Sequence, residues 1–222
     1  MPTRTPLTRS RIQATAVDLA DQRGLGGLSM RALATELGVE AMSLYHHVRG
    51  KEALLDGLVD AVFAEFHLPV VGGDWAEEMR ARSRSARAAM KRHRWAVGLM
   101  DSRRTPGPET LRHHDAVLGC LRAAGFSLPL TGHAVALLDA HLYGFVVQEV
   151  SLPFQGGEEL AELGSEILGA LPDDELLHVR EFAQGHALQP GYDFGDEFDW
   201  GLDLVLAGLA ARLGDHAPSE QP

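Results

Sequence analysis

The sequence is poor in cysteine: Cys120 is the single thiol among 222 residues, so an internal disulfide is excluded. Small secreted folds that lack a large core depend on several disulfides, and this chain has no such framework. Its 45% hydrophobic content is ample for a buried core of one or two domains. We therefore expect a reducing compartment and a buried structural role for Cys120, which has apolar neighbours.

The sequence also lacks the long apolar run that marks a membrane span or a secretion signal. No uninterrupted apolar stretch approaches the roughly 18 residues that a span needs. The first residues, MPTRTP, have no apolar segment of the kind found in signal peptides. We predict a soluble cytoplasmic protein with no membrane partner.

Catalytic motifs are missing as well. We find no nucleophile elbow, phosphate-binding loop or paired-carboxylate motif, so we predict that the protein is not an enzyme and needs no cofactor. The eleven histidines raise the question of a metal site. However, His133 and His141 are eight residues apart, which places them about 12 Å apart along a helix axis, too far to share one ion. We therefore predict no metal site.

Charge is unevenly distributed along the chain. The overall charge of −11 argues against a polyanionic partner, yet residues 1–51 carry seven basic and four acidic side chains, a balance of +3. The remaining residues carry 13 basic and 27 acidic side chains, a balance of −14. A cationic module on an acidic body can meet phosphates with one end only, which orients the protein on a nucleic acid.

Apolar residues recur every three or four positions along nearly the whole chain, which predicts an all-α fold. Pro69, Gly72 and Gly73 break the pattern, and we predict two domains, 1–66 and 67–222, on either side of this break. The predicted helices cover about 8–23, 30–37, 41–48 and 51–66, then a long helix after Asp74, one ending before Gly125, and two over 132–150 and 195–213. Residues 155–199 are strongly acidic, and we expect a mobile excursion with short helices there.

Two of the short predicted helices have the form of a helix-turn-helix. Ser29 suits the N-cap of the helix over Met30–Leu37, and Gly38 follows as a left-handed stop. The next helix, expected over Ala41–Val48, has two apolar residues four positions apart and leaves its other side chains outward. Plain helical hairpins share this outline, so the motif alone is moderately specific.

The residues around this motif make it more specific. The run GVEAMSLYHHVRGKEALL from Gly38 to Leu55, preceded by LSMRALA from Leu28 to Ala34, resembles the DNA-binding domain of the tetracycline-repressor (TetR) family of regulators. This resemblance spans roughly residues 8–66. Shorter stretches over 68–75, 125–128 and 144–149 are similar to the ligand-binding domain of the tetracycline-repressor subgroup. The resemblance implies a three-helix DNA-binding domain followed by a helical ligand-binding and dimerisation domain.

The resemblance also assigns DNA contacts to individual residues. It implies that the helix beginning at Ala41 enters the major groove, with Ala41, Met42 and Ser43 at the base edges and Arg31 able to fork two hydrogen bonds to guanine. Phosphate contacts fall to Tyr45, His47 and Lys51, and His46 completes the DNA-binding set on the same outward face. The alternative is that Tyr45 and His47 merely decorate a solvated face.

For the second domain the resemblance favours a cavity between helices that binds a small effector. Inward helix faces and matching subgroup positions give the candidate lining residues Met90, Trp95, Met100, His114, Leu118, Leu137, His141 and Phe145. These residues could also simply fill a core. We match the histidines of the subgroup's drug and magnesium sites to Ala64 and Met100, so we expect a different, largely apolar effector.

A single short recognition helix reads only a few base pairs, so useful specificity requires two copies across a pseudo-palindrome. We therefore predict a homodimer, with the helices over 132–150 and 195–213 forming a four-helix interface with their copies. The predicted function is a ligand-responsive repressor that leaves a palindromic double-stranded operator when a small molecule binds. An activator of the same fold, an interaction protein without ligand, and an enzyme with a vestigial DNA module are the alternatives.

Overall fold

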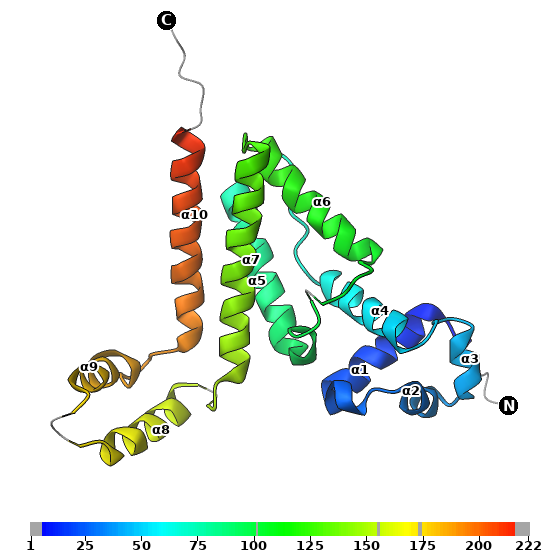
Figure 1. The fold of residues 1–222 in the computed structure, drawn as a ribbon, viewed down its shortest axis with the longest axis horizontal. Helices are drawn as coiled ribbons and strands as arrows, with labels where there is room; N and C mark the ends of the chain where they lie inside the picture. The colour runs from blue at the N-terminus through cyan, green and yellow to red at the C-terminus, as the bar shows by residue number, and fades with distance from the viewer. Residues whose placement is uncertain (1–5, 101, 155, 173–174, 216–222) are drawn as a thin grey trace, which may run out of the picture. The chain divides into compact units, whose positions relative to one another are not determined.

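The computed structural model describes residues 6–100, 102–154, 156–172 and 175–215, and every regular element within these ranges is helical. The predicted all-α class is therefore confirmed. Contacts divide the chain into two compact units, Met1–Val146 and Val147–Pro222, and Figure 1 shows their helices. The elements wholly in the first unit are α1 (Arg9–Gly27), α2 (Met30–Leu37), α3 (Ala41–Tyr45), α4 (Lys51–Phe63), α5 (Trp75–Arg92), the 3-10 turn η1 (Arg94–Ala96) and α6 (Pro108–Ala123).

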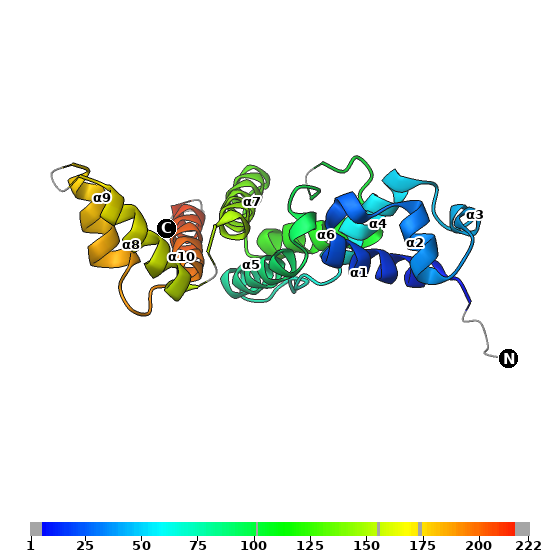
Figure 2. The same ribbon diagram turned by 90° about the horizontal axis from the view of Figure 1, so that it is seen from below.

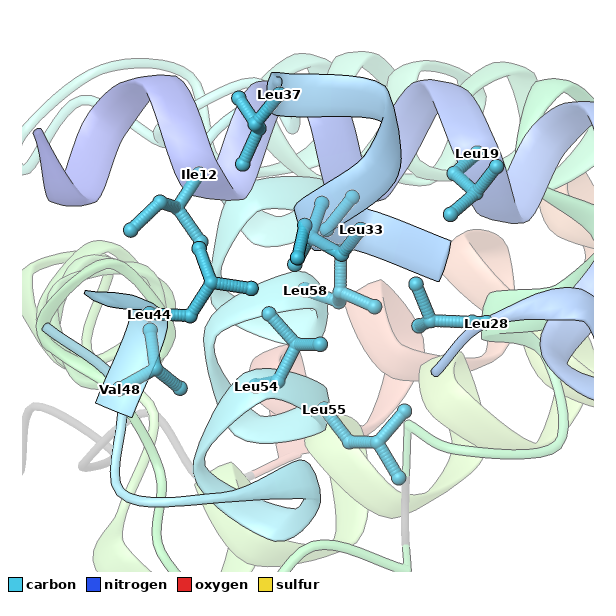
Figure 3. Packing of buried hydrophobic residues seen from close by; sticks show 12 residues of the cluster. Ile12, Leu19, Leu28, Leu33, Leu37, Leu44, Val48, Leu54, Leu55 and Leu58 are labelled. Carbon is cyan, nitrogen blue, oxygen red and sulfur yellow. The ribbon is translucent and has the colours of Figure 1, made fainter. Parts of the chain in front are cut away.

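Helices α1 to α4 share one apolar core. Figure 3 shows side chains from all four segments converging, among them Ile12 of α1, Leu33 of α2, Leu44 of α3 and Leu58 of α4, each with no exposed surface. Short helices are unstable alone in water, and burial of such a shared face is what holds them. The core thus fixes α3 against the other helices.

Local signals in the sequence define the ends of these helices. The Ser29 hydroxyl accepts a hydrogen bond from the Ala32 N–H at 3.1 Å and so caps α2. At the other end Gly38 adopts φ 65°, ψ 37°, and the N–H of Val39 donates to the carbonyl of Ala34 at 3.0 Å. This is a Schellman ending, which needs a left-handed residue and therefore favours glycine. Both predicted ends of this helix are confirmed.

Helix α3 is shorter than the sequence predicts. We expected it over Ala41–Val48, but it ends at Tyr45, and a turn follows. In that turn the N–H groups of His47 and Val48 both donate to the Leu44 carbonyl at 2.9 Å. Val48 still lies in the core, at 6% exposure, before the chain reverses at Gly50 with φ 97°. The four-residue spacing of Leu44 and Val48 therefore predicts correctly that both side chains are buried, but it does not predict where the helix ends.

Beyond α4, the chain builds the body of the first unit. Asp74 accepts hydrogen bonds from the N–H groups of Ala76 and Glu77 and so caps α5, the long helix predicted to follow Asp74. Helix α6 begins at Pro108, a residue suited to the first helical turn, and packs against α4 and α5. Figures 1 and 2 agree that α3 lies at the end of this unit far from α5 and α6, with α1 and α4 between them.

The second unit contains more helix than the acidic composition suggested. The segment expected to be an excursion with short helices includes α8, a helix of 14 residues, because apolar residues recur along it at helical spacing. Four residues of α10 are buried, namely Phe198, Leu202, Leu206 and Leu209, whereas Trp200 and Leu204 are 66% and 56% exposed. The elements here are α8 (Gly157–Ala170), α9 (Leu177–Phe182), the π turn η2 (Ala183–Ala187), the 3-10 turn η3 (Phe194–Asp196) and α10 (Glu197–Asp215).

Helix α7 (Leu128–Ser151) is the longest element and begins in the first unit. By length and composition alone it could cross a membrane, a test that core helices of soluble proteins also pass. Its most buried positions include Ala134, Leu138, Leu142 and Val146, spaced four apart along one face. This spacing is that of a helix packed along one side.

Candidate nucleic-acid interface and effector cavity

The outward face of α3 carries the residues that the sequence assigns to DNA. Met42 is 71% exposed and Tyr45 47% exposed, while Ala41 and Ser43 are half-buried at the start of the helix. His46 and His47 are exposed in the turn that follows. The structure therefore brings these residues together on one surface, with Met42 between two small residues at the helix start and the aromatic side chains at and after its end.

Two predicted DNA contacts come from neighbouring helices. Arg31 is exposed in the first turn of α2, and Lys51 is exposed in the first turn of α4. The inward residue of α3, Leu44, has no exposed surface and lies in the core that α1, α2 and α4 share. The surface that carries the predicted DNA contacts thus belongs to a packed unit, which presents its side chains in a fixed arrangement.

A cavity of about 230 Å³ lies in the first unit between α4, α6, α7 and the segment that joins η1 to α6. Helix α4 contributes Asp56, Val59 and Phe63, and α7 contributes Asp139 and Tyr143. The remaining lining residues are Met100, Arg103, Thr105, Pro106, Gly107, Thr110 and His114. The lining combines apolar side chains with carboxylates, a guanidinium and an imidazole, so it can hold a molecule with both apolar and polar groups.

The structure places two of the eight predicted ligand contacts, Met100 and His114, in the lining of this cavity. Met90 is fully buried on α5, whereas Leu118 and Leu137 are 44% and 51% exposed in the single chain. His141 and Phe145 form a ring pair with centroids 6.1 Å apart, and the Arg87 guanidinium lies 5.3 Å from the Phe145 ring. Trp95 packs beside the core of the DNA-binding helices, and its indole N–H donates to Asp21 at 2.6 Å.

Several lining residues escaped the sequence analysis. Asp56, Val59 and Phe63 lie on α4, a helix whose apolar stripe is too wide for a single contact. That width was the available signal, because a helix that borders two cavities or cores is apolar on two faces. Nothing in the sequence marks Arg103 or Asp139 as a lining residue, because a single charged residue in a loop or helix does not indicate which side chains lie next to it.

Arg103 ties the cavity to α4. Its Nε donates to Asp56 Oδ1 at 2.7 Å, and its Nη2 donates to Glu52 Oε2 at 2.7 Å. The hydrogen bond to Glu52 raises the pKa of the Arg103 guanidinium, and Asp56 adds to this effect against the opposing effect of burial. Glu52 and Asp56 are one turn apart, so one guanidinium holds the N-terminal half of α4.

A buried polar cluster borders the cavity through Asp139, which lines it. Arg82 of α5, whose side chain is 2% exposed, donates to Asp139 Oδ1 at 2.5 Å. His113 is 1% exposed, with its ring 5.5 Å from that of Phe63 and 5.4 Å from that of Phe66. Burial lowers the pKa of His113 to about 3, and the charge of Arg82 contributes, so the ring is neutral near pH 7.

One helix links the two sites. Helix α4 gives Leu54, Leu55 and Leu58 to the core beneath α3, and other side chains of the same helix line the cavity. An exposed helix-turn-helix joined in this way to a cavity between helices defines the class of DNA-binding regulators that respond to small molecules. Among the described residues, no group of three or more histidine, cysteine, aspartate or glutamate side chains is placed to hold a metal ion.

Comparison with known families agrees with this class. The family described as "Bacterial regulatory proteins, tetR family" matches residues 12–58, and "Tetracyclin repressor-like, C-terminal domain" matches residues 68–213. The second match alone spans more than half of the chain. The protein therefore belongs to the TetR family of transcriptional regulators.

Individual relatives are similar along nearly their whole length. The "HTH-type transcriptional repressor DrrR1" of Streptomyces coeruleorubidus is 32% identical, with 98% of this chain and 85% of the relative covered. The "Tetracycline repressor protein class A from transposon 1721" of Escherichia coli is 33% identical, with 94% and 93% covered. The crystal structure of the Streptomyces coelicolor TetR family protein ActR in complex with actinorhodin is 30% identical, with a TM-score of 0.80 over 96% of this chain and 100% of that one.

Proposed function

We propose that this regulator is a homodimeric repressor that binds a palindromic operator through α3 and is released when a small molecule fills the cavity beside α4. The observation that carries the proposal is the double role of α4. Its residues at 54, 55 and 58 support the recognition helix, and those at 56, 59 and 63 line the cavity. A molecule that displaces α4 from the cavity side therefore also displaces the α4 side chains on which α3 packs.

On the DNA side, the proposal gives each exposed residue a role that its chemistry allows. Met42 and the methyl group of Ala41 contact thymine methyls, Ser43 bonds a base edge, and Arg31 forks two hydrogen bonds to guanine. The phosphate contacts fall to Tyr45, His47 and Lys51, and His46 belongs to the same DNA-binding set. Since α3 offers few hydrogen-bond donors, Arg31 and the shape of the operator carry much of the specificity.

On the effector side, the lining supports a largely apolar molecule that also carries polar groups. Phe63 and Met100 provide apolar walls, while Arg103, Asp139 and His114 provide donors and acceptors. The relative ActR was solved with actinorhodin bound, which supports a small molecule as the signal for a protein of this fold. An effector acts only through unequal binding to the DNA-bound and free conformations.

Dimerisation is proposed through the faces of α7 and α10 that the single chain leaves exposed. Leu137 and Val147 on α7 are 51% and 49% exposed, and Trp200 and Leu204 on α10 are 66% and 56% exposed. Large apolar side chains exposed in this way are typical of surfaces that a second copy covers. We further propose a cytoplasmic location, no catalytic activity, and a DNA-binding domain that ends near residue 66 after α4.

The proposal is tested with the purified full chain and DNA. A duplex selected by the protein from random sequences, hereafter the selected operator, should be palindromic and should bind two copies with an affinity that falls as salt rises. A thermal-shift screen of metabolites should find a compound that stabilises the protein by about 2.7 kcal/mol at 100 times its dissociation constant. That compound should release the selected operator; binding to DNA that no stabilising compound affects would contradict the proposal.

A further inference from the structure

A histidine at the junction between the DNA-binding helices and the body contacts two carboxylates. His93 follows the last residue of α5 and is 4% exposed. Its Nδ1 lies 2.8 Å and 3.0 Å from the two carboxylate oxygens of Asp21, and its Nε2 lies 3.0 Å from Oε1 of Glu65. Both ring nitrogens therefore face acceptors.

This geometry sets how many hydrogens the ring carries. An ionised carboxylate can only accept hydrogen bonds, and a neutral imidazole has a single N–H. The ring of His93 donates to Asp21 and Glu65 together only when both nitrogens carry hydrogen and the ring is positively charged. When the ring loses one proton, one of the two contacts changes from a hydrogen bond to a repulsion between lone pairs.

The three side chains join elements that are far apart in the sequence. Asp21 lies on α1 in the DNA-binding core, Glu65 follows the end of α4, and His93 joins α5 to η1. The indole N–H of Trp95 in η1 donates to the same oxygen of Asp21 at 2.6 Å. Loss of one contact therefore weakens the attachment of either α1 or the end of α4 to the segment that joins α5 to η1.

In the part of the chain that the structure describes, charged side chains from three segments contact this cluster. From α1 the ring faces Asp21, from the segment after α4 it faces Glu65, and from α5 Arg92 reaches Glu65 as a further partner. Trp95 adds an uncharged donor from η1. With the ring protonated, the two acidic side chains are balanced by His93 and Arg92, so a proton completes a neutral cluster.

We propose that Asp21, His93 and Glu65 form a proton-dependent clamp that sets the orientation of the DNA-binding helices relative to α5. Histidine is the side chain whose charge commonly changes between pH 5 and 8. Operator binding then responds to pH through this clamp, separately from any molecule in the cavity, because the cluster lies outside the cavity lining. The clamp is a two-state element of the kind that protonation can bias.

Nitrogen-15 NMR of the full chain tests the clamp directly. Spectra are recorded from about pH 5.5 to about 8.5, and the clamp requires the His93 ring, identified by its loss in His93→Gln, to change its number of ring hydrogens within that series. The Trp95 indole resonance, identified by Trp95→Phe, should move with the same midpoint and should stay still in His93→Gln. A His93 ring that keeps one charge state over this range, or a Trp95 resonance that ignores its titration, would overturn the proposal.

Operator binding provides the functional test. The ratio of affinities for the selected operator at pH 6 and pH 8.5, at constant ionic strength, should differ between wild type and His93→Gln by about fivefold. The matched control is His178→Gln on α9, whose histidine side chain is 99% exposed and should leave the ratio unchanged. His46 and His47 are present in every variant, so their contribution to the ratio is common to all the proteins compared. Equal ratios in wild type and His93→Gln would overturn the clamp.

A second variant keeps the test informative if His93→Gln does not fold. In Glu65→Gln the amide can accept from a protonated ring or donate to a neutral one, so the contact survives on both sides of the titration. We expect Glu65→Gln to bind the selected operator with a smaller pH dependence than wild type. A Glu65→Gln protein with the full wild-type ratio would show that this contact does not carry the response.

Discussion

The carboxylate of Asp60 on α4 caps the first turn of α6 by accepting two hydrogen bonds from Thr110. The backbone N–H of Thr110 lies 2.8 Å from Asp60 Oδ1, and its hydroxyl lies 3.1 Å from the same oxygen. Asp60 is 8% exposed and Thr110 is 7% exposed. An acidic side chain of one helix thus satisfies the start of another, where the partial positive charge of the helix also favours it.

Replacing Asp60 by alanine should therefore destabilise the protein. The buried N–H of Thr110 would lose its partner, which costs about 1–3 kcal/mol. Gly107→Ala should act in the same direction, because a Cβ at that position would overlap the Asp60 carboxylate. Urea unfolding measures the change, and Asp18→Ala on the exposed face of α1 is the control. A midpoint for Asp60→Ala equal to that of wild type would rule out this capping role.

The inward and outward residues of α3 should separate stability from DNA binding. Leu44 is fully buried, so Leu44→Ala should lower the free energy of unfolding by about 2–5 kcal/mol. Met42 is 71% exposed, so Met42→Ala should change stability by no more than about 0.5 kcal/mol while weakening binding to the selected operator. Thermal unfolding and fluorescence anisotropy measure the two effects. Unchanged operator affinity in Met42→Ala would remove Met42 from the interface.

Lys51 should contribute to binding through charge alone. It is exposed in the first turn of α4, where it is proposed to hold a phosphate. Lys51→Gln should weaken binding to all DNA sequences by a similar factor and reduce the slope of log affinity against log salt by about one for each protomer. Lys91→Gln on α5 is a control that should retain the wild-type slope. A variant that changes sequence preference but keeps the slope would argue for a base contact at Lys51.

Arg103 should transmit effector binding to α4. Arg103→Gln removes the bonds to Asp56 and Glu52 and leaves every residue proposed to contact DNA in the sequence. We expect operator affinity to remain close to that of wild type, while the effector concentration needed for half-release rises by about fivefold or more. Titration of the operator complex with a stabilising compound measures this. Release of Arg103→Gln at the wild-type concentration would show that the coupling runs through other contacts.

His113 should make the protein sensitive to acid. Burial lowers its pKa from 6.5 to about 3, so the unfolded chain binds a proton below about pH 6.5 that the folded chain does not bind. This one group should make stability fall as pH decreases from about 6.5 to 3, with a slope approaching about 1.4 kcal/mol per pH unit. Urea unfolding at pH 4 to 7 should show a shallower slope for His113→Gln than for His178→Gln. Identical slopes in the two variants would contradict the assignment.

Much of the DNA-binding end was predictable from the sequence because its signals are local. Ser29 and Gly38 delimit α2 through hydrogen bonds to residues within five positions of them. The same reasoning overextended α3, because Val48 reaches the core from a turn as well as it would from a helix. A periodic apolar pattern therefore predicted which residues are buried more reliably than where the helix ends.

The cavity was less predictable. Met100 and His114 were identified, whereas Arg103, Asp139 and the lining residues of α4 were not. The partners of a charged side chain decide its role, and those partners lie far away in the chain: Arg103 bonds Asp56 across 47 positions, and Arg82 bonds Asp139 across 57. No periodicity or capping rule connects positions so far apart.

The sequence by itself determined the helical class, the helix-turn-helix and its outward residues, because propensity, capping and periodicity act over a few neighbouring residues. Only the tertiary structure decided that α4 borders both the recognition helix and the cavity, that Asp60 caps α6, and that Asp21 and Glu65 meet at His93. These contacts depend on how helices pack. Packing is set by the shapes of whole faces and not by any short run of residues.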